Sequence, residues 1–321
     1  MLFFKKNIKI ESFRYVLYKF IFKVNRFIPF KNYSIIYFID GKYHLPFATN
    51  IHQILLGLLF AKKNSFNFYF KGSKQINEIN LINVKSHNLF RYLKKKYRFY
   101  YFDRSETDFF ERKNFFDNEE NDFPIFEGDV DYYYKNIHSI ARNDLFQKIR
   151  FYKNIEISDE SLVIHLRAGD IFYNDWHSLY VQNPINFYTK ISKNYKDVLV
   201  VTEHEENNFL LNELKKRIEL SVHSGSLEED ANILLNARNL ATSGVSAFPI
   251  ACALMSQKLN NLIASDLYLE EHLNPKMMDK KIVNVELYKI NNYIKIGEFK
   301  KNKKNLEKIL SHEESEIFKI K

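Results

Sequence analysis

Apolar runs alternate with amphipathic helical segments through the second half of the chain. The runs typical of strands lie at 161–166, 197–202, 218–222, 239–243 and 261–265. Segments with helical spacing lie between them, at 185–195, 205–217, 226–237 and 247–256. This alternation predicts an α/β fold whose parallel sheet carries helices on both faces, with 261–265 as its last strand. Ligands of such sheets bind at the carboxyl ends of the strands.

The first half has a weaker pattern. Strands are expected at 34–39, 67–70 and 98–102, and a helix at 51–63 ends in lysines that suit a helix C-terminus. Residues 103–131 are acidic, rich in Phe and without a clear period, which predicts a long irregular connection or a small insertion. We therefore expect two domains, one over residues 1–155 and the other over residues 156–321.

Composition adds few constraints. The chain has 321 residues, a 45% hydrophobic fraction that is ordinary for globular proteins, and a net charge of +9 spread along its length. Its one cysteine, Cys252, cannot form an intramolecular disulfide, which fits a reducing compartment. We expect a cytoplasmic protein. Residues 13–30 mix aromatic and cationic side chains, and this pattern suits either peripheral contact with the inner membrane or a packed surface helix.

The segment 163-VIHLRAGD carries the first candidate residues. Side chains alternate along a strand, so His165 and Arg167 share one face and leave its carboxyl end together. Arg167 has a planar fork of donors suited to phosphate oxygens, and Gly169 allows a sharp turn. Asp170 could orient Arg167 or accept a proton from an acceptor hydroxyl. The alternative is a surface arginine with an aspartate that caps the turn.

The segment 226-SLEEDANILLNA predicts a helix with a capping box at its start. Leu227, Ala231 and Leu234 form its expected buried stripe, with Asp230 at the edge of that stripe. A carboxylate in this position could accept hydrogen bonds from a nucleobase or a ribose. It could equally serve only to stabilise the helix dipole.

The segment 243-SGVSAFP follows a short strand and precedes a helix. Ser243, Gly244 and Ser246 place two hydroxyls and a glycine just before a helix with Pro249 near its start. Hydroxyls, backbone N–H groups and the positive end of a helix make a phosphate site. A helix-capping serine would explain Ser246 alone, but it would leave Ser243 and Gly244 unexplained.

These segments resemble a known family. The motif 165-HLRAGD resembles the H-x-R-x-G-D motif of bacterial α-1,2-fucosyltransferases, and 230-DANILLNA with 242-TSGVSAF resembles a later segment of that family. The resemblance covers roughly residues 160–265. It implies a GT-B-like fold of two Rossmann-type halves and inverting transfer from GDP-fucose without a bound metal. On this resemblance, residues 1–155 would be the acceptor-side domain and residues 156–321 the nucleotide-sugar-binding domain. It also implies that Arg167 binds the diphosphate with help from Ser243 and Ser246, and that Asp230 meets the nucleoside.

The chain also departs from the family. Ala168 stands where a second arginine is usual, and Ala247 and Phe248 stand where the family has aromatic residues. The glycine-rich G-x-G-N-Q loop is missing, and 46-PFATNIHQ could replace it. Its three polar side chains would then approach the sugar or the acceptor: Asn50, His52 and Gln53. The reaction class is therefore better supported than the identity of the sugar.

The expected function is sugar transfer from a nucleotide sugar, with no other cofactor and no metal, to a glycan or lipid-linked oligosaccharide. Such transfer serves the synthesis of surface polysaccharide, lipopolysaccharide or capsule in bacteria. His165 and Asp170 are the first candidates for a general base. One alternative is a metal-dependent GT-A-type transferase that uses Asp129 and Asp131 of 128-GDVDYYY. Another is a basic nucleic-acid-binding or scaffold protein, although no nucleic-acid-binding motif appears and we expect no nucleic-acid partner.

Overall fold

The computed structural model describes residues 34–38, 46–63, 67–70, 72–81, 98–101, 130–167, 178–203, 208–270 and 272–320. These residues form two compact units. One holds strands β1 to β4 and the second part of helix α2. The other holds the first part of α2, residues 74–77 and all described residues from 130 onward. The units interleave in sequence, and the division at residue 155 stays a prediction.

The first unit contains a four-stranded sheet in the order β3-β2-β1-β4. Strand β1 (Ser34–Phe38) pairs in parallel with β2 (Asn67–Phe70) and with β4 (Arg98–Tyr101). Strand β3 (Ile79–Leu81) is antiparallel to β2. The predicted strands in this half are confirmed, and α2 (Phe47–Lys63) begins four residues before the predicted helix while ending, as predicted, in two lysines.

The second unit is built on a seven-stranded sheet in the order β11-β10-β9-β8-β5-β6-β7. Its strands are β5 (Ser161–Leu166), β6 (Asp197–Thr202), β7 (Ser221–His223), β8 (Asn239–Ala241), β9 (Asn261–Ser265), β10 (Asn284–Ile290) and β11 (Ile317–Lys319). All are parallel except β11. The parallel strands follow one order: β5 is central, β6 and β7 extend to one side, and β8, β9 and β10 extend to the other, with antiparallel β11 at that edge. This is the strand order of Rossmann sheets.

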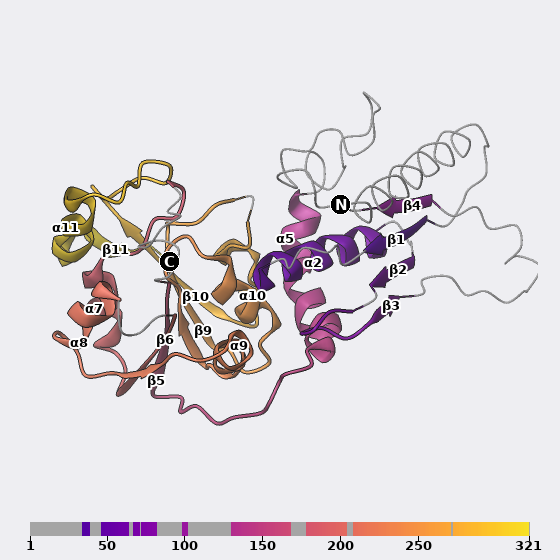
Figure 1. The fold of residues 1–321 in the computed structure, drawn as a ribbon, viewed down its shortest axis with the longest axis horizontal. Coiled ribbons are helices and arrows are strands. Elements are labelled where there is room, and N and C mark those ends of the chain that lie inside the picture. The colour runs from indigo at the N-terminus through magenta and orange to yellow at the C-terminus, as the bar shows by residue number, and fades with distance from the viewer. Residues whose placement is uncertain are drawn as a thin grey trace, which may run out of the picture. The chain divides into compact units, whose positions relative to one another are not determined.

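Helices cover both faces of this sheet (Figure 1). Helices α7 (Ile185–Ser192), α8 (Phe209–Lys215) and α11 (Lys303–Ser311) lie on one face, and α9 (Leu227–Asn236) and α10 (Ala247–Met255) lie on the other. Strand β5 is buried from Leu162 to Leu166, as expected for a central strand covered on both sides. The predicted α/β fold with a parallel sheet in this half is confirmed.

Helix α9 begins as predicted. Ser226 accepts a hydrogen bond from the backbone of Glu229, whose side chain accepts one from the Ser226 backbone, so the capping box is complete. Ala231 and Leu234 are fully buried, but the prediction for Leu227 is wrong, because its side chain is 38% exposed. Leu227 is the first helical residue, and its side chain lies outside the part of the helix that packs on the sheet.

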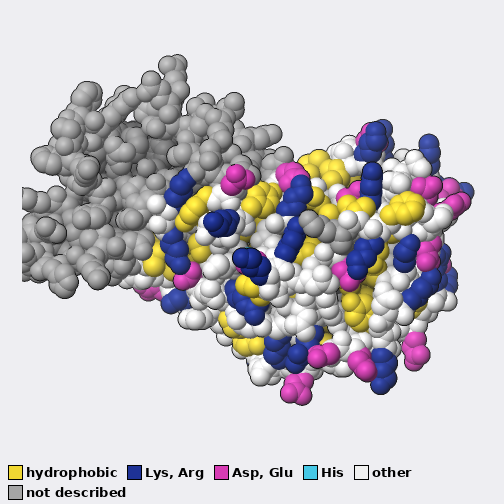
Figure 2. Space-filling model, turned by 180° about the vertical axis from the view of Figure 1, so that it is seen from behind, with side chains coloured by type: hydrophobic (Ala, Val, Ile, Leu, Met, Phe, Trp, Pro, Cys, Tyr) yellow, Lys and Arg dark blue, Asp and Glu magenta, His cyan; other side chains and the backbone are white. Residues whose placement is uncertain are grey.

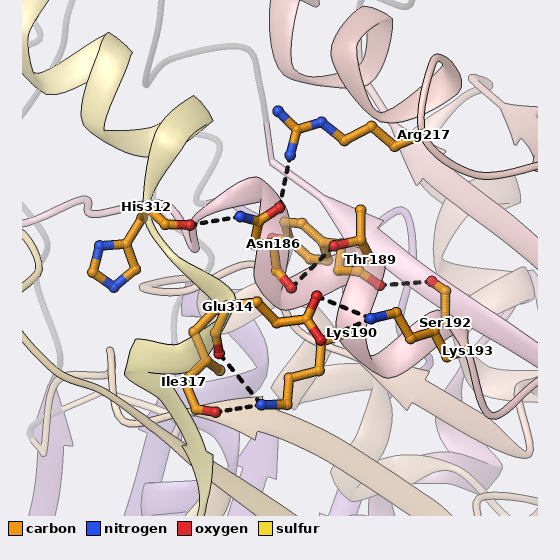
Figure 3. A network of polar contacts seen from close by, with 10 residues as sticks. Asn186, Thr189, Lys190, Ser192, Lys193, Arg217, His312, Glu314 and Ile317 are labelled. Atoms are coloured by element: carbon orange, nitrogen blue, oxygen red, sulfur yellow. Dashed lines mark hydrogen bonds and ion pairs between the residues drawn. The ribbon is translucent and has the colours of Figure 1, made fainter.

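The sheet does not end at residues 261–265 as predicted, because β10 and β11 follow. Polar and half-exposed positions in β10 weaken its sequence signal, and β11 has only three residues. Helix α7 anchors this C-terminal part (Figure 3). Lys190 Nζ donates to the carbonyl oxygen of Ile317 at 2.6 Å, and Asn186 Nδ2 donates to that of His312 at 2.6 Å.

Helix α5 (Val130–Ile140) was not predicted from the sequence, and it continues into a short π-helical segment, Ala141–Leu145. Most of the expected irregular connection at 103–131, and the amphipathic segment at 13–30, lie outside the described residues. No helix in the described parts of the chain combines the length and apolar character needed to span a membrane.

Candidate functional site

The strand order brings two predicted segments together at one edge of the second sheet. β5 and β8 are neighbours, and the chain leaves β5 toward α7 on one face and leaves β8 toward α10 on the other. Arg167 directly follows β5, and residues 242–246 directly follow β8. This is the topological switch point, where sheets of this kind bind their ligands. The two segments are about 80 residues apart in sequence, so only the fold could bring them together.

His165 and Ser243 form a buried pair across this edge. The His165 Nδ1 atom lies 2.7 Å from Ser243 Oγ, and the imidazole packs edge-on against the Phe248 ring with centroids 5.3 Å apart. His165 is 8% exposed and Ser243 is fully buried. Burial, with the nearby charge of Arg167, lowers the pKa of His165 to about 3. The imidazole is therefore neutral at physiological pH and holds the Ser243 hydroxyl in place.

Arg167 is held on two sides. Its Nη1 atom donates to the Val245 carbonyl oxygen at 2.9 Å, and its guanidinium carbon lies 4.0 Å from the centroid of the Tyr180 ring. The residue is partly exposed. A guanidinium fixed by a carbonyl and an aromatic ring keeps one orientation, which reduces the entropy lost when it binds an anion. The carbonyl that orients Arg167 belongs to the turn that precedes α10.

That turn contains the predicted glycine and the second serine. Gly244 has φ +62°, and a Cβ atom there would lie 2.3 Å from the Val181 carbonyl oxygen. No other residue fits this backbone without a shift. Ser246 is the N-cap residue of α10, but its side chain makes no capping hydrogen bond, and the first turn of α10 has no acidic residue. Because α10 follows β8 after a short turn, its positive N-terminal end lies at the same edge of the sheet, a favourable setting for an anion.

Asp230 lies elsewhere on the same edge of the sheet, beside the end of β7. Its Oδ1 atom accepts a hydrogen bond from the Gly225 N–H at 3.2 Å and lies 3.4 Å from His223 Nε2. The side chain is 8% exposed, and burial raises the pKa of Asp230 to about 6. No described contact joins Asp230 to Arg167. Its predicted contact with a nucleoside stays a prediction.

The remaining predicted residues fall into two sets. Gly169, Asp170 and Asp129 lie outside the described residues. Asn50 and His52 are buried in α2, and Gln53 is half-buried. His52 Nε2 lies 2.9 Å from Tyr133 Oη, and burial lowers the pKa of His52 to about 3. The acceptor-side role of this segment stays a prediction.

Asp131, the second carboxylate of the alternative metal site, is exposed in the first turn of α5. Among the described residues, no three or more His, Cys, Asp or Glu side chains are grouped so that they could hold a metal ion. Cys252 is fully buried in α10, and burial raises the pKa of its thiol.

Gln182 and Asn183 belong to the site region, but the sequence did not reveal them. Both are fully buried, and their amides bond to the carbonyl oxygens of Arg167 and Thr242. The only signal was a pair of amides directly before Pro184 and an amphipathic helix, which is typical of an ordinary loop and helix start.

The switch point thus combines an oriented guanidinium, a helix N-terminus, a glycine turn and a neutral His–Ser pair. Of the residues predicted to bind the donor, it brings together Arg167, Ser243, Gly244 and Ser246, with His165 beside them. This set can bind a diphosphate through a fixed positive charge, hydroxyls and backbone N–H groups. A scan of protein-family models and searches of curated proteins and of solved structures each found no match to this chain.

Proposed function

We propose that this chain is an inverting, metal-independent glycosyltransferase of GT-B-like architecture. Its reaction is transfer of a sugar, fucose from GDP-fucose, to a glycan hydroxyl in surface polysaccharide or lipopolysaccharide synthesis. One observation carries the proposal: the guanidinium of Arg167 and the turn at residues 242–246 meet at the switch point of the parallel sheet. The identity of the sugar and of the nucleoside rests on the sequence resemblance.

The proposed chemistry depends mainly on electrostatics. As an acceptor hydroxyl attacks the anomeric carbon, the diphosphate leaves and gains negative charge. Arg167 and the backbone N–H groups at the start of α10 would stabilise that charge from fixed positions. Binding of donor and acceptor in line supplies the positional part of the rate acceleration.

The general base is a separate question. With a pKa near 3, His165 is a weak base at neutral pH, and its Nδ1 atom is engaged with Ser243. We assign His165 the role of holding the Ser243 hydroxyl in place. Asp170, the next candidate in the motif, would then serve as the general base.

The two alternatives have less support. On the face seen in Figure 2, Lys and Arg side chains are spread among acidic, apolar and other residues and do not form one continuous basic strip. A nucleic-acid-binding protein would concentrate them along one face. In the metal-dependent alternative Asp131 would be one of the two ligands, and it is exposed in the first turn of α5.

Nucleotide binding tests the proposal. Thermal-shift and calorimetric measurements would compare nucleoside diphosphates and nucleotide sugars of each base, with and without a chelator. We expect ligands of one base to stabilise the wild-type protein by about 2.7 kcal/mol at a hundred times their dissociation constant, with no effect of the chelator.

The variants Arg167→Ala and Arg238→Ala make a matched pair. Arg238 precedes β8 at the opposite edge of the same sheet and pairs with Asp159, which is exposed. We expect Arg167→Ala to weaken nucleotide binding by about 10- to 100-fold, because it removes hydrogen bonds between charged groups, and Arg238→Ala to leave it unchanged. Absence of binding by every nucleotide, or equal binding by both variants, would overturn the proposal.

A further inference from the structure

Residues 181–183 form a buried polar link below the proposed diphosphate site. They lie in the segment between β5 and α7, and all three are fully buried. Two of them are amides, which are costly to bury unless their hydrogen bonds are made. Their hydrogen-bond partners include groups at the ends of three neighbouring strands, β5, β8 and β9.

Gln182 bonds in both directions. Its Nε2 atom donates to the Arg167 carbonyl oxygen at 2.6 Å. Its Oε1 atom accepts from Tyr188 Oη at 2.8 Å and from the Asn183 backbone N–H at 2.9 Å. Its own carbonyl oxygen accepts from Tyr293 Oη at 2.9 Å. The side chain is therefore fixed in orientation, and it holds the backbone of Arg167.

The neighbouring residues hold the other two strand ends. Asn183 Nδ2 donates to the Thr242 carbonyl oxygen at 2.9 Å, and its Oδ1 atom accepts from Ser265 Oγ at 2.6 Å. The Val181 carbonyl oxygen accepts from the Val245 N–H at 3.0 Å. The turn at 242–246 is thus attached to the same short segment as Arg167.

The sheet itself does not supply this connection. The register between β5 and β8 ends at the pair Ile164 and Ala241, before Arg167 and before the turn. Beyond that pair, the described contacts from the end of β5 to the turn are His165 with Ser243, Arg167 with Val245, and the link through residues 181–183.

We propose that Gln182 and Asn183 are positioning residues that fix Arg167 relative to the turn at residues 242–246, an inference that rests on the proposed function. Neither amide needs to touch the ligand. Gln182 holds the carbonyl oxygen of Arg167, and Asn183 holds that of Thr242, at the start of the turn that would bind the ligand. A displacement of about 1 Å at such a site can cost about a hundredfold in rate, so the link matters beyond its effect on stability.

The test compares Gln182→Met with Asn239→Ala. Methionine keeps the approximate volume of Gln182 and removes its hydrogen bonds. Asn239 is also a buried amide that donates to two carbonyl oxygens, those of Asp159 and Ser161, but at the opposite edge of the sheet. For each variant, calorimetry would give the dissociation constant of the nucleoside diphosphate that stabilises the wild type most, at a temperature well below its melting temperature.

We expect both variants to melt at a lower temperature, but only Gln182→Met to bind the diphosphate about tenfold or more weakly. Introducing Gln182→Met into an Arg167→Lys protein should add much less than that, because the amide acts through the position of Arg167. If Gln182 had only a structural role, both variants would affect binding to a similar extent, and the effect of Gln182→Met would be the same with Arg167 and with Arg167→Lys.

Tyr293→Phe provides a second route if Gln182→Met does not fold. It removes one hydroxyl that bonds to Gln182 and keeps the ring, so binding should weaken by about two- to fivefold. Unchanged binding in Gln182→Met, or in Tyr293→Phe if that variant has to be used, would overturn the inference and leave the proposed function intact. Absence of nucleotide binding by the wild type would overturn both.

Discussion

Gly244 offers the sharpest test of the site geometry. Its φ of +62° lies in the left-handed region, and the position of its missing Cβ is 2.3 Å from the Val181 carbonyl oxygen and 3.1 Å from the Asn183 backbone nitrogen. The perturbation is Gly244→Ala, which adds one methyl group. Backbone atoms cannot rotate away as a flexible side chain does, so the turn and residues 181–183 must separate.

The expected cost has three parts. The left-handed conformation costs about 1–2 kcal/mol for a residue with a Cβ. Forcing an extra methyl group into packed surroundings costs about 1–3 kcal/mol. The hydrogen bond from the Val245 N–H to the Val181 carbonyl oxygen, 3.0 Å long, contributes about 1 kcal/mol and would be strained or lost. We expect Gly244→Ala to lower the free energy of unfolding by about 3–6 kcal/mol.

Gly297→Ala separates the clash from the conformational strain. Gly297 has φ +91°, and no atom lies within 4 Å of its missing Cβ. Its substitution should therefore cost only the conformational strain, about 1–2 kcal/mol. Urea denaturation gives both values from the change in midpoint, provided that the slope stays constant. Calorimetry should show weaker nucleotide binding in Gly244→Ala alone. Equal losses of stability in the two variants would refute the reasoning about Gly244.

Two further predictions concern stability. Burial raises the pKa of Asp230 from 3.8 to about 6, so the folded protein binds a proton at this carboxylate more tightly than the unfolded chain does. The free energy of unfolding should therefore increase as pH falls from 6 to 4, because the buried carboxylate becomes protonated and loses its charge. Asp230→Asn should therefore raise the free energy of unfolding at pH 8 by about 1–3 kcal/mol and flatten its change between pH 4 and 6 in urea titrations; a loss at pH 8 would contradict this. Asn239→Ala should lower the free energy of unfolding by about 2–4 kcal/mol, because the carbonyl oxygens of Asp159 and Ser161 lose their donor, and an unchanged urea midpoint would contradict that.

Local signals in the sequence were sufficient for much of the second unit. The strands at 161–166, 197–202 and 261–265 occur as predicted. Each is a short apolar run bounded by polar residues, a pattern typical of buried strands. The start of α9 was equally clear, since a capping box is formed within four consecutive residues. Strand β10 was missed because most of its side chains are exposed or half-exposed, so it has no continuous apolar pattern.

The sequence alone determined the α/β class, most helices and strands, and the presence of His165, Arg167, Ser243 and Ser246 at strand ends. These features depend on periodicity and on neighbours within a few residues. Only the tertiary structure decided that β8 lies beside β5, that His165 bonds to Ser243, and that Gln182 holds Arg167. The lowered pKa of His165 likewise depends on the tertiary structure, because it is caused by burial. Strand order, side-chain partners and burial all arise from the packing of distant segments, and no local pattern encodes them.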